Sequence, residues 1–367
     1  MDIGVPKERR KFEFRVGLSP AGVEMLTHQG HHCFVENDAG TGAGFSDQDY
    51  EHAGATIVYS SEEAYGRADL VLKFARPLQN ELEWIPPGKA LAGYLYLASS
   101  RQNRIDTLLA KKITSIAWEQ VQLPDGSRPV LSALSQIGGL MTAQIAASLL
   151  QNNDGGKGIM LGGLPGVPPA EVVILGAGTA GRNATRAFIG LGAHVTVLDQ
   201  SIEALQRVYE QFTCIGTMIS TERNIERCCA YADVVIGAVN VPGERAPIVV
   251  NRSAVAKMKP RSVIIDLSID QGGCFETSRP TKHDRPTYVE EGVIHYCVPN
   301  IPGVVARTST HAFMNFALPF ISEIANLGVD EAIEKNPGIA VAINTRNGEI
   351  FKLTRFNIKE EGHHGAE

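Results

Sequence analysis

The stretch VVILGAGTAG, residues 172–181, sets the expected fold class of this 367-residue chain. Its first four residues are apolar and predict a buried strand, and a glycine pattern follows directly at Gly176, Gly178 and Gly181. Gly176 permits a tight turn, Gly178 lets the backbone approach a pyrophosphate, and Gly181 lets a helix pack on the strand. The order of strand, glycine turn and helix therefore predicts a dinucleotide-binding βαβ unit.

An acidic residue after the next predicted strand supports this interpretation. The strand at residues 194–198 is followed by Asp199, whose carboxylate is placed to hold the two hydroxyls of a ribose. The two residues after Asp199 are not arginines, so nothing there favours a 2′-phosphate, and NAD is favoured over NADP. Thr179 and Ala180 begin the expected helix, and their backbone N–H groups belong to the same cofactor site. The alternative is a glycine turn in an α/β protein that binds no nucleotide.

Short apolar runs alternate with amphipathic stretches along nearly the whole chain, which indicates βαβ units and parallel sheets. We expect an α/β protein of two Rossmann-like, doubly wound domains, one inserted into the other. The predicted borders give a discontinuous outer domain, residues 1–130 and 308–367, around an NAD-binding domain, residues 131–307. Near the C-terminus, the pattern predicts a long helix over residues 308–327 that is broken at Pro319.

The composition disfavours several other classes of protein. The 34 basic and 40 acidic residues give a formal net charge of −6, which provides no field to gather nucleic acid or anionic lipid. No uninterrupted apolar run reaches the roughly 18 to 20 residues of a membrane span, and the first residues do not form a secretory signal. The six cysteines form no CxxC pair, which favours reduced thiols. We therefore expect a cytoplasmic protein without a metal, nucleic-acid or membrane partner.

Several longer segments carry a family resemblance: GVPKE at 4–8, EFRV at 13–16 with SPAGV at 19–23, GGLPGV at 162–167, DLSIDQGG at 266–273 and RTST at 307–310. On these segments the chain resembles the alanine dehydrogenase and pyridine nucleotide transhydrogenase α-subunit family over nearly all of residues 1–345. It is most similar to the NAD-dependent alanine dehydrogenases. The resemblance implies an NAD-dependent oxidoreductase that transfers a hydride between NAD(H) and the α-carbon of a small amino acid, oxo acid or imine. It also implies a homo-oligomer, a hexamer or a dimer.

The resemblance further implies a substrate site on the outer domain. Arg15 would clamp the substrate carboxylate, because a guanidinium fork matches a carboxylate in two hydrogen bonds. Lys73 would hold the other substrate oxygens and take part in catalysis, together with Asp270 beside the reacting carbon. Asn300 would contact the substrate. The cofactor contacts that the resemblance implies, besides the glycine turn and Asp199, are Ser135, Ser220, Val239 and Asn300.

Each of the substrate-site residues also has a plainer structural explanation. Arg15 is alternatively a surface arginine at the end of a strand, and Lys73 an ordinary lysine at the end of its own strand. Asp270 is alternatively a brace for the glycine turn at residues 272–273. Asn300 lies in a short loop between prolines and alternatively only holds a turn.

The chain departs from the family pattern at the position of the catalytic histidine. Tyr96, in YLYLA at residues 94–98, stands at that place. A tyrosine hydroxyl has an ordinary pKa of about 10 against about 6.5 for histidine, so it donates a hydrogen bond but does not readily exchange a proton at neutral pH. Tyr96 remains a candidate catalytic residue as such a donor. Arg76 and Gln136 replace expected acidic residues near the substrate cleft, which together with Tyr96 favours an altered substrate or chemistry. Ala204 stands where a basic residue often approaches the adenosine.

Two alternatives of another class remain open at this stage. The chain is alternatively a non-catalytic NAD-binding subunit, in the manner of the soluble domain of the transhydrogenase α-subunit. It is alternatively an NAD-binding regulator that has lost catalysis, for which the missing histidine is the best argument. The retained Arg15 and Lys73 favour an enzyme, because a pure nucleotide carrier does not need them.

The first testable prediction concerns the choice of cofactor. Asp199 should repel a 2′-phosphate and bind a ribose diol, so NADH should bind much more tightly than NADPH. The double change Asp199→Gly with Gln200→Arg should narrow or reverse that preference. Dissociation constants from nucleotide fluorescence titrations check this, and equal affinities in the unmodified protein would contradict it.

Overall fold

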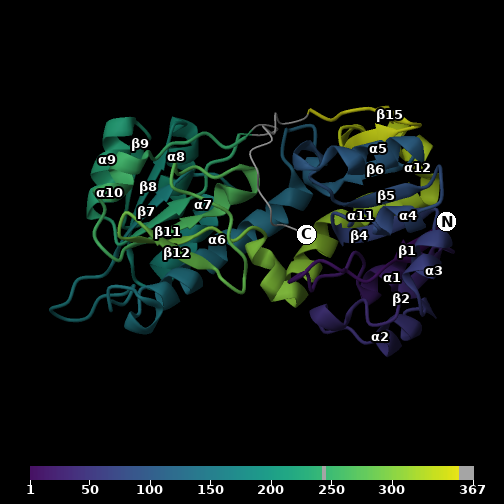
Figure 1. Ribbon diagram of the computed structural model, residues 1–367, viewed down its shortest axis with the longest axis horizontal. Helices are drawn as coiled ribbons and strands as arrows, with labels where there is room; N and C mark the ends of the chain where they lie inside the picture. Colours follow the sequence, from purple (N-terminus) through teal and green to yellow (C-terminus); the bar gives the residue numbers. More distant parts are fainter. Residues whose placement is uncertain (242–244, 355–367) are drawn as a thin grey trace. The chain divides into compact units, whose positions relative to one another are not determined.

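The computed structural model describes residues 1–241 and 245–354 (Figure 1). The chain forms two compact units. The first unit comprises Met1–Leu134 with the described residues from Gly303 onward, and the second comprises Ser135–Pro302. The second unit is thus inserted into the first, as the sequence predicts. The chain crosses between the units after residues 134 and 302, whereas the predicted borders follow residues 130 and 307.

The first unit contains an eight-stranded sheet with the order β15-β14-β6-β5-β4-β1-β2-β3. The strands from β6 to β3 are all parallel, and β14 pairs with β6 in the antiparallel direction. Counted along the chain, the six parallel strands follow the order 3-2-1-4-5-6 of a doubly wound sheet. Such sheets bind ligands at the carboxyl ends of their strands where this order reverses, here between β1 and β4. The strands are β1 Asp2–Val5, β2 His32–Glu36, β3 Thr56–Val58, β4 Leu70–Ala75, β5 Ala90–Tyr94, β6 Thr114–Ala117, β14 Ile343–Arg346 and β15 Glu349–Ile350.

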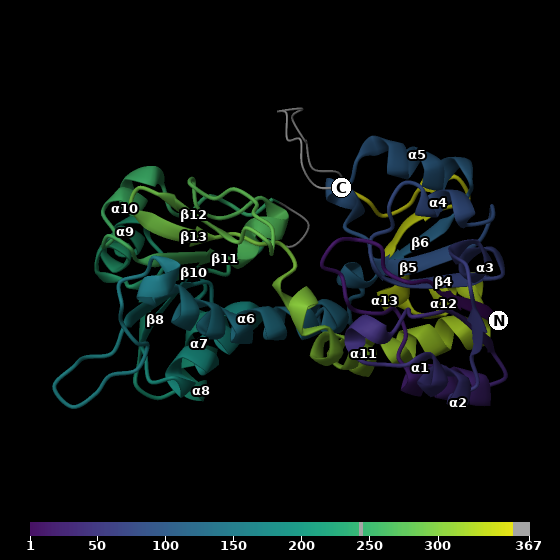
Figure 2. The same cartoon turned by 60° about the horizontal axis from the view of Figure 1, so that its bottom comes forward.

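Helices cover both faces of this sheet, as Figure 2 shows. Leu72 and Phe74 of β4 belong to one core, to which α1, α11, α12 and α13 contribute. Val71 belongs to a second core with residues of α3, α4 and α5. Because side chains alternate along a strand, Lys73 lies on the same face as Val71. The helices are α1 Pro20–His28, α2 Asp47–His52, α3 Ser61–Gly66, α4 Glu81–Trp84, α5 Gln102–Ala110, α11 Ala306–Leu327, α12 Val329–Lys335 and α13 Pro337–Ala340.

The second unit contains a seven-stranded sheet with the order β12-β13-β11-β10-β7-β8-β9. Six of these strands are parallel and again follow the doubly wound order, while β12 pairs with β13 in the antiparallel direction. The order reverses between β7 and β10. The strands are β7 Glu171–Leu175, β8 His194–Asp199, β9 Ile215–Ile219, β10 Val234–Gly237, β11 Val263–Asp266, β12 Thr287–Glu290 and β13 Val293–Tyr296.

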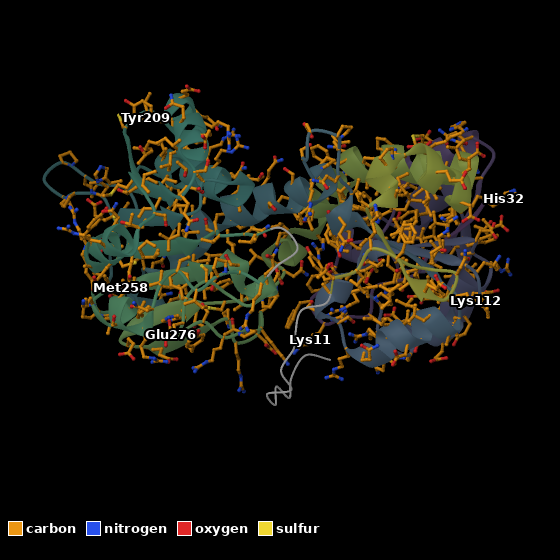
Figure 3. The ribbon with its side chains drawn as sticks, turned by 90° about the horizontal axis from the view of Figure 1, so that it is seen from above. Lys11, His32, Lys112, Tyr209, Met258 and Glu276 are labelled. Carbon is orange, nitrogen blue, oxygen red and sulfur yellow. The ribbon has the colours of Figure 1, made fainter. Side chains whose placement is uncertain are left out.

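In Figure 2 this sheet lies between α9 and α10 on one side and α7 and α8 on the other. Each helix turns one apolar side to the sheet. In α8, Leu205 and Val208 are buried, whereas Tyr209 is 63% exposed and points outward in Figure 3. The helices of this unit are α7 Thr179–Gly190, α8 Ile202–Gln211, α9 Glu222–Tyr231 and α10 Arg252–Ala256, and α6 Pro129–Leu149 begins in the first unit and continues into this one.

The structure corrects the predicted break at Pro319. The helix α11 runs through Pro319 from Ala306 to Leu327. A proline removes one backbone hydrogen bond from a helix, but buried apolar residues lie on both sides of it, including Phe313 and Ile321. Burial of this stripe in the core of the first unit outweighs the lost bond. Sequence patterning also missed β9, α9, β12, β13 and the β14–β15 hairpin, which are short or only partly buried.

Helix α6 is long and apolar enough, by length and composition, to cross a membrane, with a mean hydropathy of 1.3 over 18 residues. Serine, glutamine and threonine interrupt its apolar runs, so it contains no uninterrupted apolar stretch of that length. Half of that window is buried inside the protein. Core helices of globular domains have the same properties.

The packing of α11 yields a stability prediction. The ring of Phe313 lies 4.9 Å from that of Phe74 and 5.6 Å from that of Tyr94, measured between centroids. Phe313→Ala should lower the free energy of unfolding by about 3–5 kcal/mol, because a buried aromatic side chain is replaced by a cavity. Phe316→Ala is the matched control on the same helix, since Phe316 is 38% exposed.

Urea unfolding followed by tryptophan fluorescence measures this effect in the first unit, which holds both tryptophans of the chain. The control should cost less than about 1 kcal/mol. Equal losses in the two variants would show that α11 is not held by this aromatic cluster.

Candidate functional site

The three glycines of the turn in the second unit, Gly176, Gly178 and Gly181, have two different roles. Gly176 has a φ of +105°, and a Cβ there would lie 2.4 Å from the carbonyl oxygen of Ala238. A Cβ on Gly181 would lie 1.8 Å from the carbonyl oxygen of Gly176. The first and third glycines are therefore required by the protein's own packing. A Cβ on Gly178 would meet no heavy atom within 4 Å, so the backbone there is open on the side that a ligand approaches.

Asp199 ties the end of β8 to this turn. Its Oδ2 accepts a hydrogen bond from the backbone N–H of Ala177 at 2.6 Å, and its Oδ1 accepts one from Ser201 at 2.8 Å. Each carboxylate oxygen has a second lone pair for a ribose hydroxyl. Gly178 caps α7 without a side-chain hydrogen bond, so no capping side chain uses the backbone N–H groups of its first turn. A helix N-terminus and a carboxylate in this arrangement fit the pyrophosphate and ribose of NAD.

Two further predicted cofactor residues lie at the ends of strands in the same unit. Ser220 follows β9, and its backbone N–H donates to the carbonyl oxygen of Asp199 at 2.9 Å. Val239 follows β10, beside the point where the sheet order reverses, and its carbonyl oxygen accepts from Ser268 Oγ at 2.7 Å. Ser135 lies on α6 as the first residue of the second unit.

The structure brings Asp270 and Asn300 together. The backbone N–H of Asn300 donates to Asp270 Oδ2 at 3.5 Å, and Asn300 has a left-handed φ of +60°. Asp270 is exposed in the short helical turn after β11. The brace for the neighbouring glycine turn is Asp266, whose Oδ2 accepts from the backbone N–H of Cys274 at 3.0 Å and from Ser278 Oγ at 2.6 Å. Asp266 thus braces this segment, and the roles considered for Asp270 stay predictions.

Lys73 is the centre of a buried ion cluster in the first unit. Its side chain has no exposed surface, and its Nζ lies 2.6 Å from Glu81 Oε1 and 3.2 Å from Glu8 Oε2. Tyr65 donates a hydrogen bond to the same Glu81 oxygen at 2.9 Å. Burial alone would lower the pKa of Lys73, but the charges of Glu8 and Glu81 raise it above its ordinary value. Complete burial between two carboxylates rules out an ordinary exposed lysine at a strand end.

Glu8 was not singled out as a site residue by sequence analysis. It comes three residues after β1, and its Oε1 accepts from the backbone N–H of Phe74 in β4 at 2.7 Å. It thus joins the two strands between which the sheet order reverses. Burial raises the pKa of Glu8 to about 7, although the charge of Lys73 acts in the opposite direction. In the sequence, Glu8 could have been identified by its position, because it is a carboxylate shortly after the first strand of a doubly wound fold.

Arg15 is also buried, at 3% exposure, which excludes the alternative of a surface arginine. Its Nε and Nη2 donate to the two carboxylate oxygens of Glu13, at 2.6 Å and 2.5 Å. Its guanidinium lies 3.9 Å above the ring of Phe74. Burial acts to lower the pKa of Arg15, but the charge and hydrogen bonds of Glu13 outweigh this effect, so the pKa lies above its ordinary value. Gly17 lets this segment close on β4, because a Cβ there would lie 2.3 Å from the carbonyl oxygen of Leu72.

Tyr96 has a strained backbone that a buried carboxylate supports. Its φ is +43°, in the left-handed region that few non-glycine residues adopt. Its backbone N–H donates to Glu119 Oε1 at 2.6 Å, and its carbonyl oxygen accepts from Arg76 Nη1 at 3.4 Å. Its ring stacks on that of Tyr94 with centroids 6.4 Å apart. Burial raises the pKa of Glu119 to about 7. A contact of the Tyr96 hydroxyl with Lys73 or Asp270 stays a prediction.

No group of three or more metal-ligating side chains occurs within residues 1–241 and 245–354. All six cysteines are unpaired thiols, and five of them are buried.

Two family models cover most of the sequence. The N-terminal domain of alanine dehydrogenase/PNT matches residues 4–138, and the C-terminal domain of alanine dehydrogenase/PNT matches residues 142–352. The alanine dehydrogenase of Mycolicibacterium smegmatis is 44% identical over 352 residues, which cover 96% of this chain and 95% of that protein. The chain belongs to the alanine dehydrogenase/PNT family.

Other comparisons agree with this membership. The alanine dehydrogenase of Methanococcus maripaludis is 45% identical, with 95% of this chain and 94% of that protein covered. A solved structure of an L-alanine dehydrogenase matches with a TM-score of 0.92 and 43% identity, over 95% of this chain and 96% of that one. A transhydrogenase from Sinorhizobium meliloti shares the fold, with a TM-score of 0.82 and 24% identity over 95% of this chain and 98% of that one. The predicted family and fold class are confirmed, and with them the class of NAD-dependent amino acid dehydrogenases.

The different roles of the glycines generate a prediction about the cofactor. Gly178→Ala should leave the fold intact, because its new Cβ meets no protein atom, but it should weaken NADH binding by about tenfold or more where the pyrophosphate approaches. Gly181→Ala, the matched variant in the same turn, should instead lower the melting temperature by about 5 °C or more, since its Cβ collides with the backbone.

Thermal unfolding without nucleotide and fluorescence titration with NADH separate the two effects. If Gly178→Ala bound NADH as tightly as the unmodified protein, the pyrophosphate would not lie over this glycine.

Proposed function

We propose that this protein catalyses hydride transfer between NAD(H) and the α-carbon of a small amino acid, its 2-oxo acid or the corresponding imine. The first unit is the substrate domain in this proposal, and the inserted unit binds NAD. The observation that carries it is the buried Lys73, held by Glu8 and Glu81 where the strand order of the first unit reverses. A buried cation at that edge suits a polar, anionic ligand.

NAD, when bound, accepts or returns a hydride at its nicotinamide ring. In the second unit, the open backbone at Gly178, the first turn of α7 and the carboxylate of Asp199 would hold it. The cofactor contacts assigned to Ser135, Ser220, Val239 and Asn300 belong to the same proposal. Asp270, which accepts a hydrogen bond from Asn300, is proposed as the catalytic carboxylate of this unit.

In the first unit, Arg15 binds the substrate α-carboxylate in this proposal. Glu13 occupies the Nε–Nη2 edge of its guanidinium and fixes the plane of the group, so that the Nη1 side is presented in one orientation. Lys73 carries three N–H donors, one of which donates to Glu81 Oε1, while Glu8 Oε2 lies 3.2 Å from Nζ as an ion-pair partner. A further N–H of Lys73 is proposed to donate to the carbonyl or hydroxyl oxygen of the substrate. Such fixed donors polarise a carbonyl without reorganising during the reaction.

Tyr96 is proposed to donate a hydrogen bond to the reacting carbonyl or imine. Its hydroxyl does not replace the proton exchange of a histidine at neutral pH. Glu8 has a pKa raised by burial to about 7 and contacts Lys73, so this pair holds a proton that is exchangeable at neutral pH. The finer predictions, a homo-oligomer in the cytoplasm with no membrane or nucleic-acid partner, stay predictions.

The experiment that tests the proposal is a substrate panel read by NADH absorbance. One arm combines amino acids with NAD, and the other combines 2-oxo acids with NADH and either ammonium or a primary amine. Turnover of any member supports an enzyme and excludes a nucleotide carrier or regulator. Tight NADH binding without turnover of any member would favour the non-catalytic alternative.

The role of Tyr96 yields a separate prediction. Tyr96→Phe should lower turnover by about 10- to 10³-fold if the hydroxyl polarises the transition state. Tyr96→His should create or increase activity between alanine and pyruvate, because it restores a group that titrates near neutral pH. Steady-state kinetics on the best substrate of the panel measure both effects. Full activity of Tyr96→Phe would assign proton transfer to Lys73 and Asp270 without the hydroxyl.

A further inference from the structure

A buried arginine without a counter-ion lies beside the Lys73 cluster. Arg104, in the first turn of α5, is 9% exposed, and its Nε is buried without a hydrogen-bond partner among the described residues. No carboxylate of residues 1–241 or 245–354 forms an ion pair with it. Burial lowers the pKa of Arg104, and the charges of Arg10 and Arg101 lower it further. A guanidinium stays charged in a protein, so the cost of this burial persists in the ligand-free state.

A second arginine, Arg10, comes from the segment after β1 and lies close enough for its charge to act on Arg104. Its Nε donates to the carbonyl oxygen of Arg76 at 2.8 Å, which orients the guanidinium. Its Nη2 is buried and has no hydrogen-bond partner in the part of the chain that the structure describes. Arg76 in turn donates to the carbonyl oxygen of Tyr96 at 3.4 Å. These contacts join Arg10, through Arg76, to the segment that carries Tyr96.

The acidic groups nearby are already engaged. Glu81 and Glu8 contact Lys73, and Glu13 holds Arg15 in a two-bond ion pair. None of these carboxylates forms an ion pair with Arg10 or Arg104. An added anion would supply the missing partner, and two guanidinium groups are suited to bind the oxygens of a carboxylate or phosphate.

The position of α5 adds to this preference for an anion. The helix begins after Arg101 without a side-chain cap, so its first-turn backbone N–H groups add positive potential at the same end as Arg104. Gln79 Oε1 is a further buried atom without a partner, while Gln79 Nε2 donates to Thr107 of α5 at 2.8 Å. Unsatisfied polar atoms on neighbouring segments indicate a polar space that a ligand or water fills.

We propose that Arg10 and Arg104 form a second anion subsite, which binds the side-chain carboxylate of a dicarboxylic amino acid or 2-oxo acid. This inference rests on the proposed function, because it assigns the substrate class of that same site. Lys73 and Arg15 would hold the α-carboxylate end, and the two unpaired arginines the far end. The replacement of the expected acidic residue by Arg76 removes a charge that would repel such a substrate.

The first test compares oxo acids that differ only in the second carboxylate. With NADH and ammonium, kcat/KM for 2-oxoglutarate should exceed that for 2-oxopentanoate. Arg104→Gln should lower this ratio by about 10- to 100-fold, the range for a lost hydrogen bond to a charged group. Arg101→Gln removes the same charge from an exposed neighbour and is the matched control, with an unchanged ratio expected.

The second test measures stability and needs no turnover. Arg104→Gln should raise the melting temperature in an anion-poor buffer, because it removes an unpaired buried charge. Succinate should raise the melting temperature of the unmodified protein but not of this variant. Arg104→Lys keeps a charge without the planar fork and should restore part of the succinate effect. A merely structural arginine would instead destabilise the protein when replaced, with succinate having no differential effect.

The outcomes separate the two proposals. If no oxo acid is turned over but succinate stabilises the protein through Arg104, the subsite stands and the proposed reaction fails. If 2-oxopentanoate is used as well as 2-oxoglutarate, in both the unmodified protein and Arg104→Gln, the subsite is overturned and the reaction stands. If inorganic phosphate stabilises the protein through Arg104 and succinate does not, the anion is a free phosphate, and the dicarboxylic substrate is overturned.

Discussion

The ion cluster of Lys73 with Glu8 and Glu81 is the interaction on which the first unit depends. An ammonium group without exposed surface is tolerated only where opposite charges and hydrogen bonds replace its water. Those partners come from three places: the strand β4 supplies Lys73, the segment after β1 supplies Glu8, and the start of α4 supplies Glu81. Removing Lys73 would leave two carboxylates buried without their cation, so the cluster joins sheet and helix.

The same cluster sets the electrostatics of the neighbouring groups. The charge of Glu8 helps to raise the pKa of Lys73, and burial raises the pKa of Glu8 itself to about 7. Arg15 is fixed by Glu13 on the ring of Phe74, the next residue after Lys73 in β4. The carboxylates nearest to the arginines of α5 and of the segment after β1 are thus committed to other cations. That commitment leaves Arg10 and Arg104 without ion pairs among the described residues.

Backbone hydrogen bonds hold the turn that carries Tyr96. The strand β5 ends at Tyr94, and the chain then enters a left-handed turn whose backbone N–H groups at residues 95 and 96 both donate to Glu119. These bonds are made by the backbone and not by the side chain. The hydrogen bonds that hold this turn therefore do not depend on which side chain stands at position 96.

The sequence by itself determined the fold class, the inserted second unit, the glycine turn and Asp199. These features are local, because strand, turn and helix are adjacent in the chain and the periodicity of apolar residues reports burial directly. The family resemblance added Arg15, Lys73, Asp270 and Asn300 as candidate residues. Local patterns failed at Pro319, where tertiary burial on both sides of the proline holds one continuous helix.

Only the tertiary structure decided which charges are paired. Glu13, Glu81 and Glu119 are ordinary acidic residues in the sequence, and nothing in their spacing distinguishes them from surface carboxylates. Only its position shortly after the first strand marks Glu8. Their burial depends on contacts between segments that are far apart in the chain, such as the bond from Phe74 to Glu8. The burial of Arg104 could not be predicted from the sequence, because it too depends on contacts between distant segments. An arginine lacks a partner only when every carboxylate that the fold brings near it is already bound elsewhere.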